Sequence, residues 1–167
     1  HTHVARPRLD KADLVVGLGA ELLDRPDDGL ERDLATRRTP DQTGGVRMSR
    51  FIQLEGRLSL TGANADRRLR VRDSHLGAVG ASIAHELVVV RQLGPLAADA
   101  AVTSALAPFA IDTVAPRVGV DPAALKALAG ELAAAAGRTV VVAGGSASDT
   151  ANGPAVELAA LVLNLTL

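Results

Sequence analysis

Three short apolar runs in the first half of the chain predict β-strands. Residues 13–19 (DLVVGLG) are almost continuously apolar and end in a glycine turn, as expected for a strand covered on both faces. Residues 50–54 predict a second strand, which ends at Glu55-Gly56. Residues 69–72 alternate between apolar and basic side chains, and this predicts a short third strand at the edge of a sheet.

Helices are predicted between and after these strands. Arg25-Pro26-Asp27-Asp28 opens the first helix, because proline and acidic residues favour the first helical turn. Leu30 and Leu34 form its apolar stripe, whereas residues 39–45 and 59–66 predict irregular structure. Four further helices are predicted. One covers residues 96–114 with an interruption at Pro108. The other three have the apolar core faces Leu76/Val79/Ile83/Leu87/Val90, Leu125/Leu128/Leu132 and Val156/Ala159/Ala160/Leu163.

Capping residues and prolines set the limits of the second and third helices. Asp73 or Ser74 is expected to cap the second helix, since short polar side chains accept hydrogen bonds from the first free amides. Gly94-Pro95 is expected to end that helix. Pro116 is expected to separate the third helix from the element that follows it.

The order of the elements predicts the fold class. Asp121-Pro122 begins a helix that is expected to end at Gly137, and residues 139–142 (TVVV) then predict a buried β-branched strand. Short apolar strands that alternate with amphipathic helices are typical of an α/β fold with a parallel sheet. We therefore predict a Rossmann-like three-layer domain with a mainly parallel sheet, formed by residues 1–167 as a single unit.

The composition excludes several kinds of function. The 167 residues include no Cys, Trp or Tyr and only two Phe. Without cysteine there is no thiolate zinc site, no cysteine-ligated iron–sulfur cluster and no disulfide. The shortage of aromatic rings leaves no stacking surface for single-stranded nucleic acid. A net charge of −1 gives no general attraction to nucleic acid or anionic lipid, and no segment has the roughly 18 apolar residues of a membrane span.

Two glycine-rich turns lie where chemistry is often found. Gly17-Leu18-Gly19 follows a strand, as a dinucleotide-binding turn does, but Leu22 replaces the third glycine of G-x-G-x-x-G. Residues 144–148 (GGSAS) resemble a G-x-S-x-G nucleophile elbow, but Ser148 replaces the last glycine and no histidine follows His85. We interpret both segments as tight turns and predict no catalytic residue.

Two further groups of polar residues carry weaker signals. His85-Glu86 begins like the zinc motif H-E-x-x-H, but Val89 replaces the second histidine, so we predict no metal site. Arg67, Arg68, Arg70 and Arg72 form a basic ridge, in which the last three share one face of a strand. Salt bridges to nearby carboxylates or simple solvation are expected there, with a phosphate or an acidic partner as the alternative.

Several stretches resemble molybdopterin oxidoreductases of the dimethyl sulfoxide reductase type. Residues 11–21 (KADLVVGLGAE) are similar to the first strand and turn of that family, and residues 48–57 (MSRFIQLEGR) to its second. Residues 60–71 (LTGANADRRLRV) resemble one branch in particular, the large iron–sulfur subunit of alternative complex III. The resemblance continues in order over residues 137–144 and 155–165, with Asn164 at a characteristic Asn position, and omits about residues 95–120.

The resemblance implies a place for a cofactor and also two departures from it. In molybdenum-containing relatives, the turns after the first two strands hold the guanosine ends of the pterin cofactor. Gly19, Glu21, Glu55 and Arg57 would occupy those places. However, Glu55-Gly56-Arg57 replaces the usual D-P-R, and residues 73–75 (DSH) stand where P-G-T-D is usual. The alternative complex III branch is understood to lack the pterin in this region, so the resemblance implies a vestigial site with no cofactor.

The function implied is that of a cofactor-free scaffold domain in a subunit that passes quinol electrons through iron–sulfur clusters located elsewhere in the parent. The parent is expected to be membrane-associated on the periplasmic side, with other domains of the parent and membrane-complex subunits as partners. The chain starts at His1 rather than Met, as expected of a piece of a larger chain, and a homodimer of the piece is a further expectation. Two alternatives stay open: an intact molybdopterin-guanine-dinucleotide-binding domain of an oxidoreductase, or a free-standing nucleotide-binding module.

Overall fold

The computed structural model describes residues 7–24, 29–39 and 48–167. Within them, one parallel sheet of four strands forms the centre of the molecule, in the order β3-β2-β1-β4. The strands are β1 (Leu14–Leu18), β2 (Arg50–Glu55), β3 (Arg67–Arg70) and β4 (Thr139–Ala143). The sheet confirms the predicted α/β class and the predicted position of the third strand at an edge, although β3 begins and ends two residues earlier than expected.

Strand β1 is buried along its whole length and is paired on both sides. Val16 lies opposite Ile52 of β2 and opposite Val141 of β4. All five residues of β1 are buried, as the continuous apolar run predicts for a central strand of a parallel sheet.

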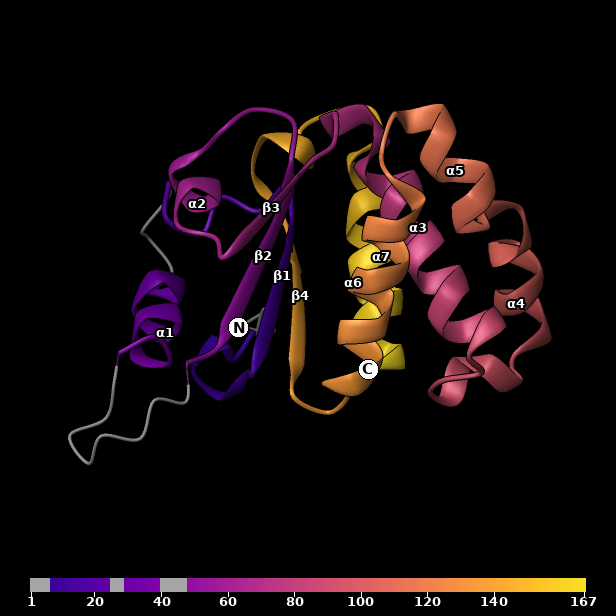
Figure 1. The fold of residues 1–167 in the computed structure, drawn as a ribbon, viewed down its shortest axis with the longest axis horizontal. Coiled ribbons are helices and arrows are strands. Elements are labelled where there is room, and N and C mark those ends of the chain that lie inside the picture. Colours follow the sequence, from indigo (N-terminus) through magenta and orange to yellow (C-terminus); the bar gives the residue numbers. More distant parts are fainter. Residues whose placement is uncertain (1–6, 25–28, 40–47) are drawn as a thin grey trace, which may run out of the picture.

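Helices cover both faces of the sheet, which confirms the three-layer arrangement (Figure 1). One face carries the short helices α1 (Leu30–Thr36) and α2 (Leu60–Ala63). The other face carries α3 (Leu76–His85), α6 (Pro122–Ala134) and α7 (Gly153–Thr166). The predicted helix opening at residues 25–28 and most of the predicted loop at 39–45 lie outside the described residues.

Residues 95–118 form an additional outer layer on α3. Helices α4 (Ala100–Leu106) and α5 (Ile111–Val118) are joined by a 3-10 turn, Ala107–Phe109, where the sequence predicts an interruption. The prediction that Pro116 separates two helices is wrong, because Pro116 lies inside α5. A proline this close to the helix end removes a single backbone hydrogen bond, and the helix then stops at Gly119, whose φ is +70°.

Two apolar clusters fill the spaces between the layers. The larger one joins the sheet to α3, α6 and α7 and includes the predicted core residues Ile83, Leu128 and Leu163. The smaller one lies on the opposite face and includes Phe51 and Leu34. None of the helices in the described part of the chain is long and apolar enough to cross a membrane.

Helix α3 differs from the prediction at both ends. Neither Asp73 nor Ser74 caps it; a 3-10 turn precedes the helix, and the Asp73 carboxylate accepts a hydrogen bond from the Gly56 amide at 3.1 Å instead. After His85 the helix continues as one turn of π-helix, Glu86–Val90. Hydrogen bonds from i+5 to i rotate the apolar face relative to an α-helix, so Val90 is exposed rather than part of the core face.

Two segments that surround the sheet also correct the predictions. Residues 59–66, predicted as irregular, contain α2, whose N-cap Ser59 accepts from the Gly62 amide at 2.9 Å. A helix of one turn has no apolar period that a pattern could detect. The helix predicted to end at Gly137 stops at Ala134, and Gly137 lies in the following turn with φ +78°.

Strand β4 is an edge strand and not the buried strand that the sequence predicts. Only Val141 is buried, since no further strand of the described segments covers the outer side. The Asn164 side chain of α7 covers that side at one point. Its Oδ1 accepts from the Val141 amide at 2.9 Å, and its Nδ2 donates to the Val141 carbonyl at 2.7 Å. Asn164 thus pairs with the strand edge as a neighbouring backbone would.

Helices α3 and α7 approach each other through small residues. A Cβ atom added to Gly80 would lie 2.7 Å from the Cβ of Ala159, and one added to Gly77 would lie 2.8 Å from the Cβ of Ala155. The atom nearest to each position is an alanine methyl group on α7, which cannot rotate aside as a longer side chain can.

We therefore expect Gly80→Ala to lower the free energy of unfolding by about 1–3 kcal/mol, because the two helices must separate. Gly130→Ala in α6 is the control, since its new Cβ would meet only the Arg91 guanidinium at 3.8 Å. The control is expected to gain about 0.5–1 kcal/mol from helix propensity. Urea unfolding of both variants measures the difference, and equal stabilities would contradict the close packing of α3 on α7.

Candidate functional site

The carboxyl ends of the four strands lie at one edge of the sheet (Figure 1). Strands β2 and β3 lie on one side of β1 and β4 lies on the other, so the strand order reverses between β1 and β4. In open α/β sheets, ligands bind in the crevice outside the strand ends at such a point. The segments that leave the strands here are residues 19–24 after β1, 56–59 after β2 and 144–148 after β4. These segments contain three of the four predicted cofactor-binding residues, Gly19, Glu21 and Arg57. The fourth, Glu55, is the last residue of β2.

The chain itself closes the crevice between β1 and β4. Gly19 forms an isolated bridge with Ala143, and a Cβ added to Gly19 would collide with the Cβ of Ala147. Ala147 is buried in the 3-10 turn Gly145–Ala147 and belongs to the larger apolar cluster. Gly19 has φ +68°, which a residue with a Cβ rarely adopts. The glycine is therefore needed for contact between two turns of the protein.

The Glu21 carboxylate occupies the polar part of the same crevice. Its Oε1 accepts a hydrogen bond from the Ser146 amide at 3.2 Å and pairs with Arg57 Nη2 at 3.0 Å. The side chain of Glu21 is only 8% exposed. Backbone amides in a turn after a parallel strand are the groups that bind phosphate in nucleotide-binding proteins. Here the Glu21 carboxylate of the chain itself accepts the hydrogen bond from one of these amides. The structure therefore brings Gly19, Glu21 and Arg57 together.

Glu55, the fourth predicted residue, faces a different group of atoms. Its carboxylate lies beneath α2, where it accepts from Ser59 Oγ at 2.5 Å and from the Ser59 amide at 3.3 Å. Arg68 Nε donates to the same carboxylate at 2.5 Å. Gly62 lies directly above, since a Cβ at that position would overlap the carboxylate. Glu55 thus holds α2 against the sheet and is not grouped with Gly19, Glu21 and Arg57.

Gln53 belongs to the same buried layer and is not among the predicted site residues. It shares a strand face with Glu55, is 1% exposed and donates from Nε2 to the Ala20 carbonyl at 2.8 Å. Gly17 of β1 leaves room for its side chain. Its Oε1 is buried without a hydrogen-bond partner among the described residues. A polar residue in the middle of an apolar strand is the signal that could have identified it.

Asp24 connects the turn after β1 to α2. Its carboxylate accepts hydrogen bonds from the Leu60 amide at 3.1 Å, the Thr61 amide at 3.0 Å and Thr61 Oγ1 at 2.7 Å. Partial burial raises the pKa of Asp24, but the hydrogen bonds from Thr61 and Leu60 outweigh that effect and hold the pKa below its ordinary value. Asp24 and Thr61 are also absent from the predicted site.

The basic ridge divides between two surroundings. Arg68 pairs with Glu55, and Arg67 pairs with Glu131 of α6 at 2.7 Å, as the salt-bridge interpretation predicts. Arg70 and Arg72 lie further along and take no part in these pairs. The prediction that three arginines share a strand face is wrong for Arg72, because β3 ends at Arg70.

The other sequence motifs do not assemble into a catalytic or metal centre in the described residues. Ser148 donates to Glu157, and His85 is the last residue of α3. No group of three or more potential metal ligands occurs in the part of the chain that the structure describes.

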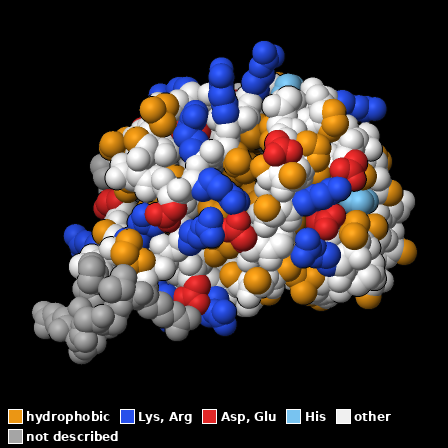
Figure 2. Space-filling model, in the orientation of Figure 1, with side chains coloured by type: hydrophobic (Ala, Val, Ile, Leu, Met, Phe, Trp, Pro, Cys, Tyr) orange, Lys and Arg blue, Asp and Glu red, His pale blue; other side chains and the backbone are white. Residues whose placement is uncertain are grey.

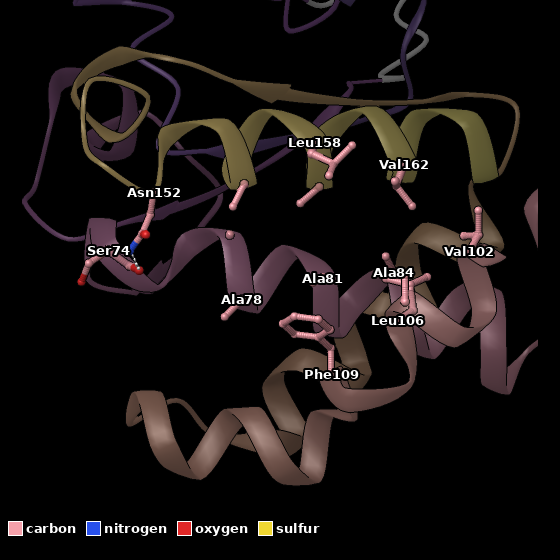
Figure 3. A pocket seen from close by; sticks show the side chains of 14 residues that line it. Ser74, Ala78, Ala81, Ala84, Val102, Leu106, Phe109, Asn152, Leu158 and Val162 are labelled. Atoms are coloured by element: carbon pink, nitrogen blue, oxygen red, sulfur yellow. Dashed lines mark hydrogen bonds between the residues drawn. The ribbon is translucent and has the colours of Figure 1, made fainter.

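A second concavity lies on the helical side and is apolar (Figure 3). It has a volume of about 510 Å³ and no charged side chain in its lining. Leu158 and Val162 of α7, Ala81 of α3, and Leu106 and Phe109 of the outer layer form its walls. At one end, Asn152 Nδ2 donates to the Ser74 carbonyl at 2.9 Å.

Comparison with known proteins identifies the fold but not a family. No family model matches this chain, and no curated protein does. Among solved structures, acetylene hydratase from Pelobacter acetylenicus is similar with a TM-score of 0.71 and 15% sequence identity. The match covers 95% of this chain and 22% of that one, so the chain spans about a fifth of the length of the protein it matches.

Asp24→Asn tests the connection between the β1 turn and α2. An amide group offers a single acceptor, so we expect a loss of about 1–2 kcal/mol at pH 7. Because the folded-state pKa of Asp24 is depressed, its stabilisation is present above the unfolded-state pKa of about 4 and is lost as the pH falls through the folded-state pKa.

Urea unfolding of the wild type and of Asp24→Asn at pH 7 and near pH 3 gives the measurement. The difference between the two proteins is expected to shrink at the lower pH. A difference that stays constant with pH would show that the charge of Asp24 is not involved.

Proposed function

We propose that this chain is a cofactor-free scaffold domain of a molybdopterin oxidoreductase-like electron-transfer subunit. The fold supports the first part of this proposal, since acetylene hydratase is a molybdopterin enzyme of the dimethyl sulfoxide reductase type. The resemblance of residues 11–21 and 48–57 to the same family adds a second, independent line of support.

The side chains that fill the strand-end crevice support the proposal that no pterin cofactor binds there. The residues present do not fit the guanosine end of such a cofactor. Glu21 is bonded to the Ser146 amide and to Arg57, and Glu55 is bonded to Ser59 and Arg68. Both carboxylates would repel a pyrophosphate group, and the contact of Gly19 with Ala147 leaves no space between the turns.

Residues 61–66 (TGANAD), which carry the resemblance to alternative complex III, have structural contacts that suit a scaffold. Thr61 binds Asp24, and Gly62 lies over Glu55. Asp66 accepts from Arg38 at two positions, each at 2.7 Å, and from the Phe51 amide at 2.7 Å. In our proposal the parent passes quinol electrons through iron–sulfur clusters outside this domain, in an assembly on the periplasmic side of a bacterial membrane.

The apolar helical side provides a surface for the other domains of such a parent. Leu158, Leu161 and Leu165 are each more than half exposed and follow one another at intervals of three and four residues along α7. Leu158 also lines the apolar concavity. Since acetylene hydratase is several times longer than this chain, we propose that further chain covers this face in the parent.

Ligand-induced stabilisation tests the absence of the cofactor. At millimolar concentration, GDP is expected to raise the melting temperature no more than inorganic pyrophosphate does, because Glu21 and Ala147 fill the crevice. Arg57→Ala is expected to leave that difference unchanged. A rise that is specific for GDP and is lost in Arg57→Ala would contradict the scaffold and favour the intact dinucleotide-binding domain.

The association state of the isolated chain tests the apolar face. We expect self-association that increases with concentration and that the double variant Leu161→Gln/Leu165→Gln abolishes, because an uncovered apolar face pairs with a second copy. Sedimentation velocity measures the mass. Leu58→Gln, which changes an even more exposed leucine near α2, is the control and should associate as the wild type does. A wild type that stays monomeric throughout would argue against an interaction face on α7.

A further inference from the structure

A third concavity lies beside the carboxyl end of the edge strand β3. It has a volume of about 500 Å³ and lies between the residues that lead from β3 into α3 and the end of α5. Four cationic or titratable basic side chains line it, together with Pro116, Val118 and Gly119: Arg70, Arg72, His75 and Arg117. Figure 2 shows Lys or Arg side chains and a histidine gathered along the upper edge of the molecule, above the strand ends.

The three arginines of this basic pocket have no carboxylate partner among the described residues. The other two arginines of β3 are paired, Arg67 with Glu131 and Arg68 with Glu55. No acidic side chain of the described segments lines the pocket. Arg70, Arg72 and Arg117 therefore place three positive charges around one hollow, where they repel one another unless an anion lies between them.

Two further features add to the positive field. His75 Nδ1 is buried and has no hydrogen-bond partner within the described part of the chain. His75 is also the residue before the ten-residue helix α3, and no side chain caps that helix. The positive end of the helix dipole therefore lies next to the arginines.

We propose that this basic pocket binds the phosphate group of a small phosphorylated molecule. Guanidinium groups match phosphate oxygens with paired hydrogen bonds, and three of them around one hollow suit a dianion better than a single carboxylate. The volume is that of a small-molecule site. A net charge of −1 gives no field for a nucleic acid polymer. The pocket is distinct from the crevice filled by Glu21, and Arg117 comes from the outer layer, for which the sequence resemblance has no counterpart.

Titration calorimetry at constant ionic strength tests this proposal, with inorganic phosphate, pyrophosphate and citrate as probes. Pyrophosphate is expected to bind more tightly than phosphate, and citrate more weakly than either. The double variant Arg72→Gln/Arg117→Gln is expected to weaken pyrophosphate binding at least tenfold. Arg32→Gln is the matched control, because Arg32 is an exposed arginine on α1, on the opposite face of the sheet, and it should bind as the wild type does.

Thermal unfolding without ligand checks that the variants fold. Removing unpaired like charges is expected to leave the melting temperature unchanged or higher. If the double variant is unstable, the single variant Arg70→Gln replaces it, with weaker pyrophosphate binding again expected. Equal pyrophosphate binding in the wild type and the arginine variants would overturn the proposal. Citrate binding as tight as that of pyrophosphate would overturn the assignment to phosphate.

Discussion

The rest of the structure depends on the pairing of β1 with a parallel strand on each side. Since β2 and β4 both run in the direction of β1, each connection must cross a face of the sheet. The connections place α1 and α2 on one side and the longer helices on the other. The same pairing brings the three turns after β1, β2 and β4 to one edge. Gly19 allows the turns after β1 and β4 to meet, and Gly17 leaves room in β1 for the Gln53 side chain.

The polar groups at this edge are largely satisfied by one another rather than left open for a ligand. Glu21 accepts a hydrogen bond from the Ser146 amide, and Asp24 accepts from two amides of α2. Glu55 accepts from Ser59 and Arg68. A buried carboxylate that lacks such partners costs several kcal/mol, so this network stabilises the edge as it stands. The basic pocket beside β3 differs in this respect, because its three arginines have no carboxylate partner within residues 7–24, 29–39 and 48–167. The proposed scaffold role rests on the closed centre of this edge, and the proposed anion site rests on its cationic side.

The fold could be predicted from the sequence where a long apolar pattern exists. The run at 13–19, the Asp121-Pro122 helix start and the apolar face of α7 all correspond to the structure. Shorter features were missed for physical reasons. Helix α2 has one turn and depends on Ser59 and Asp24. The π-turn at Glu86–Val90 rotates a face that sequence spacing treats as straight.

The candidate site could be predicted only in part. Gly19, Glu21 and Arg57 do come together, because turns after neighbouring parallel strands meet at one edge. The contacts of Glu55 and Gln53 depend on which face of the sheet each side chain lies on, and those of Asp24 depend on where α2 lies. No local sequence motif specifies how the helix that follows each strand packs against the sheet, so these contacts could not be predicted.

Amide hydrogen exchange at Ser146 tests the central claim most directly, namely that Glu21 closes the crevice between β1 and β4. The Ser146 amide is expected to be protected in the wild type, because it donates to the Glu21 carboxylate. Glu21→Ala should raise its exchange rate roughly tenfold or more, whereas Val16 in the centre of the sheet should remain protected. A Ser146 amide that exchanges freely in the wild type, or that keeps its protection in Glu21→Ala, would contradict the account.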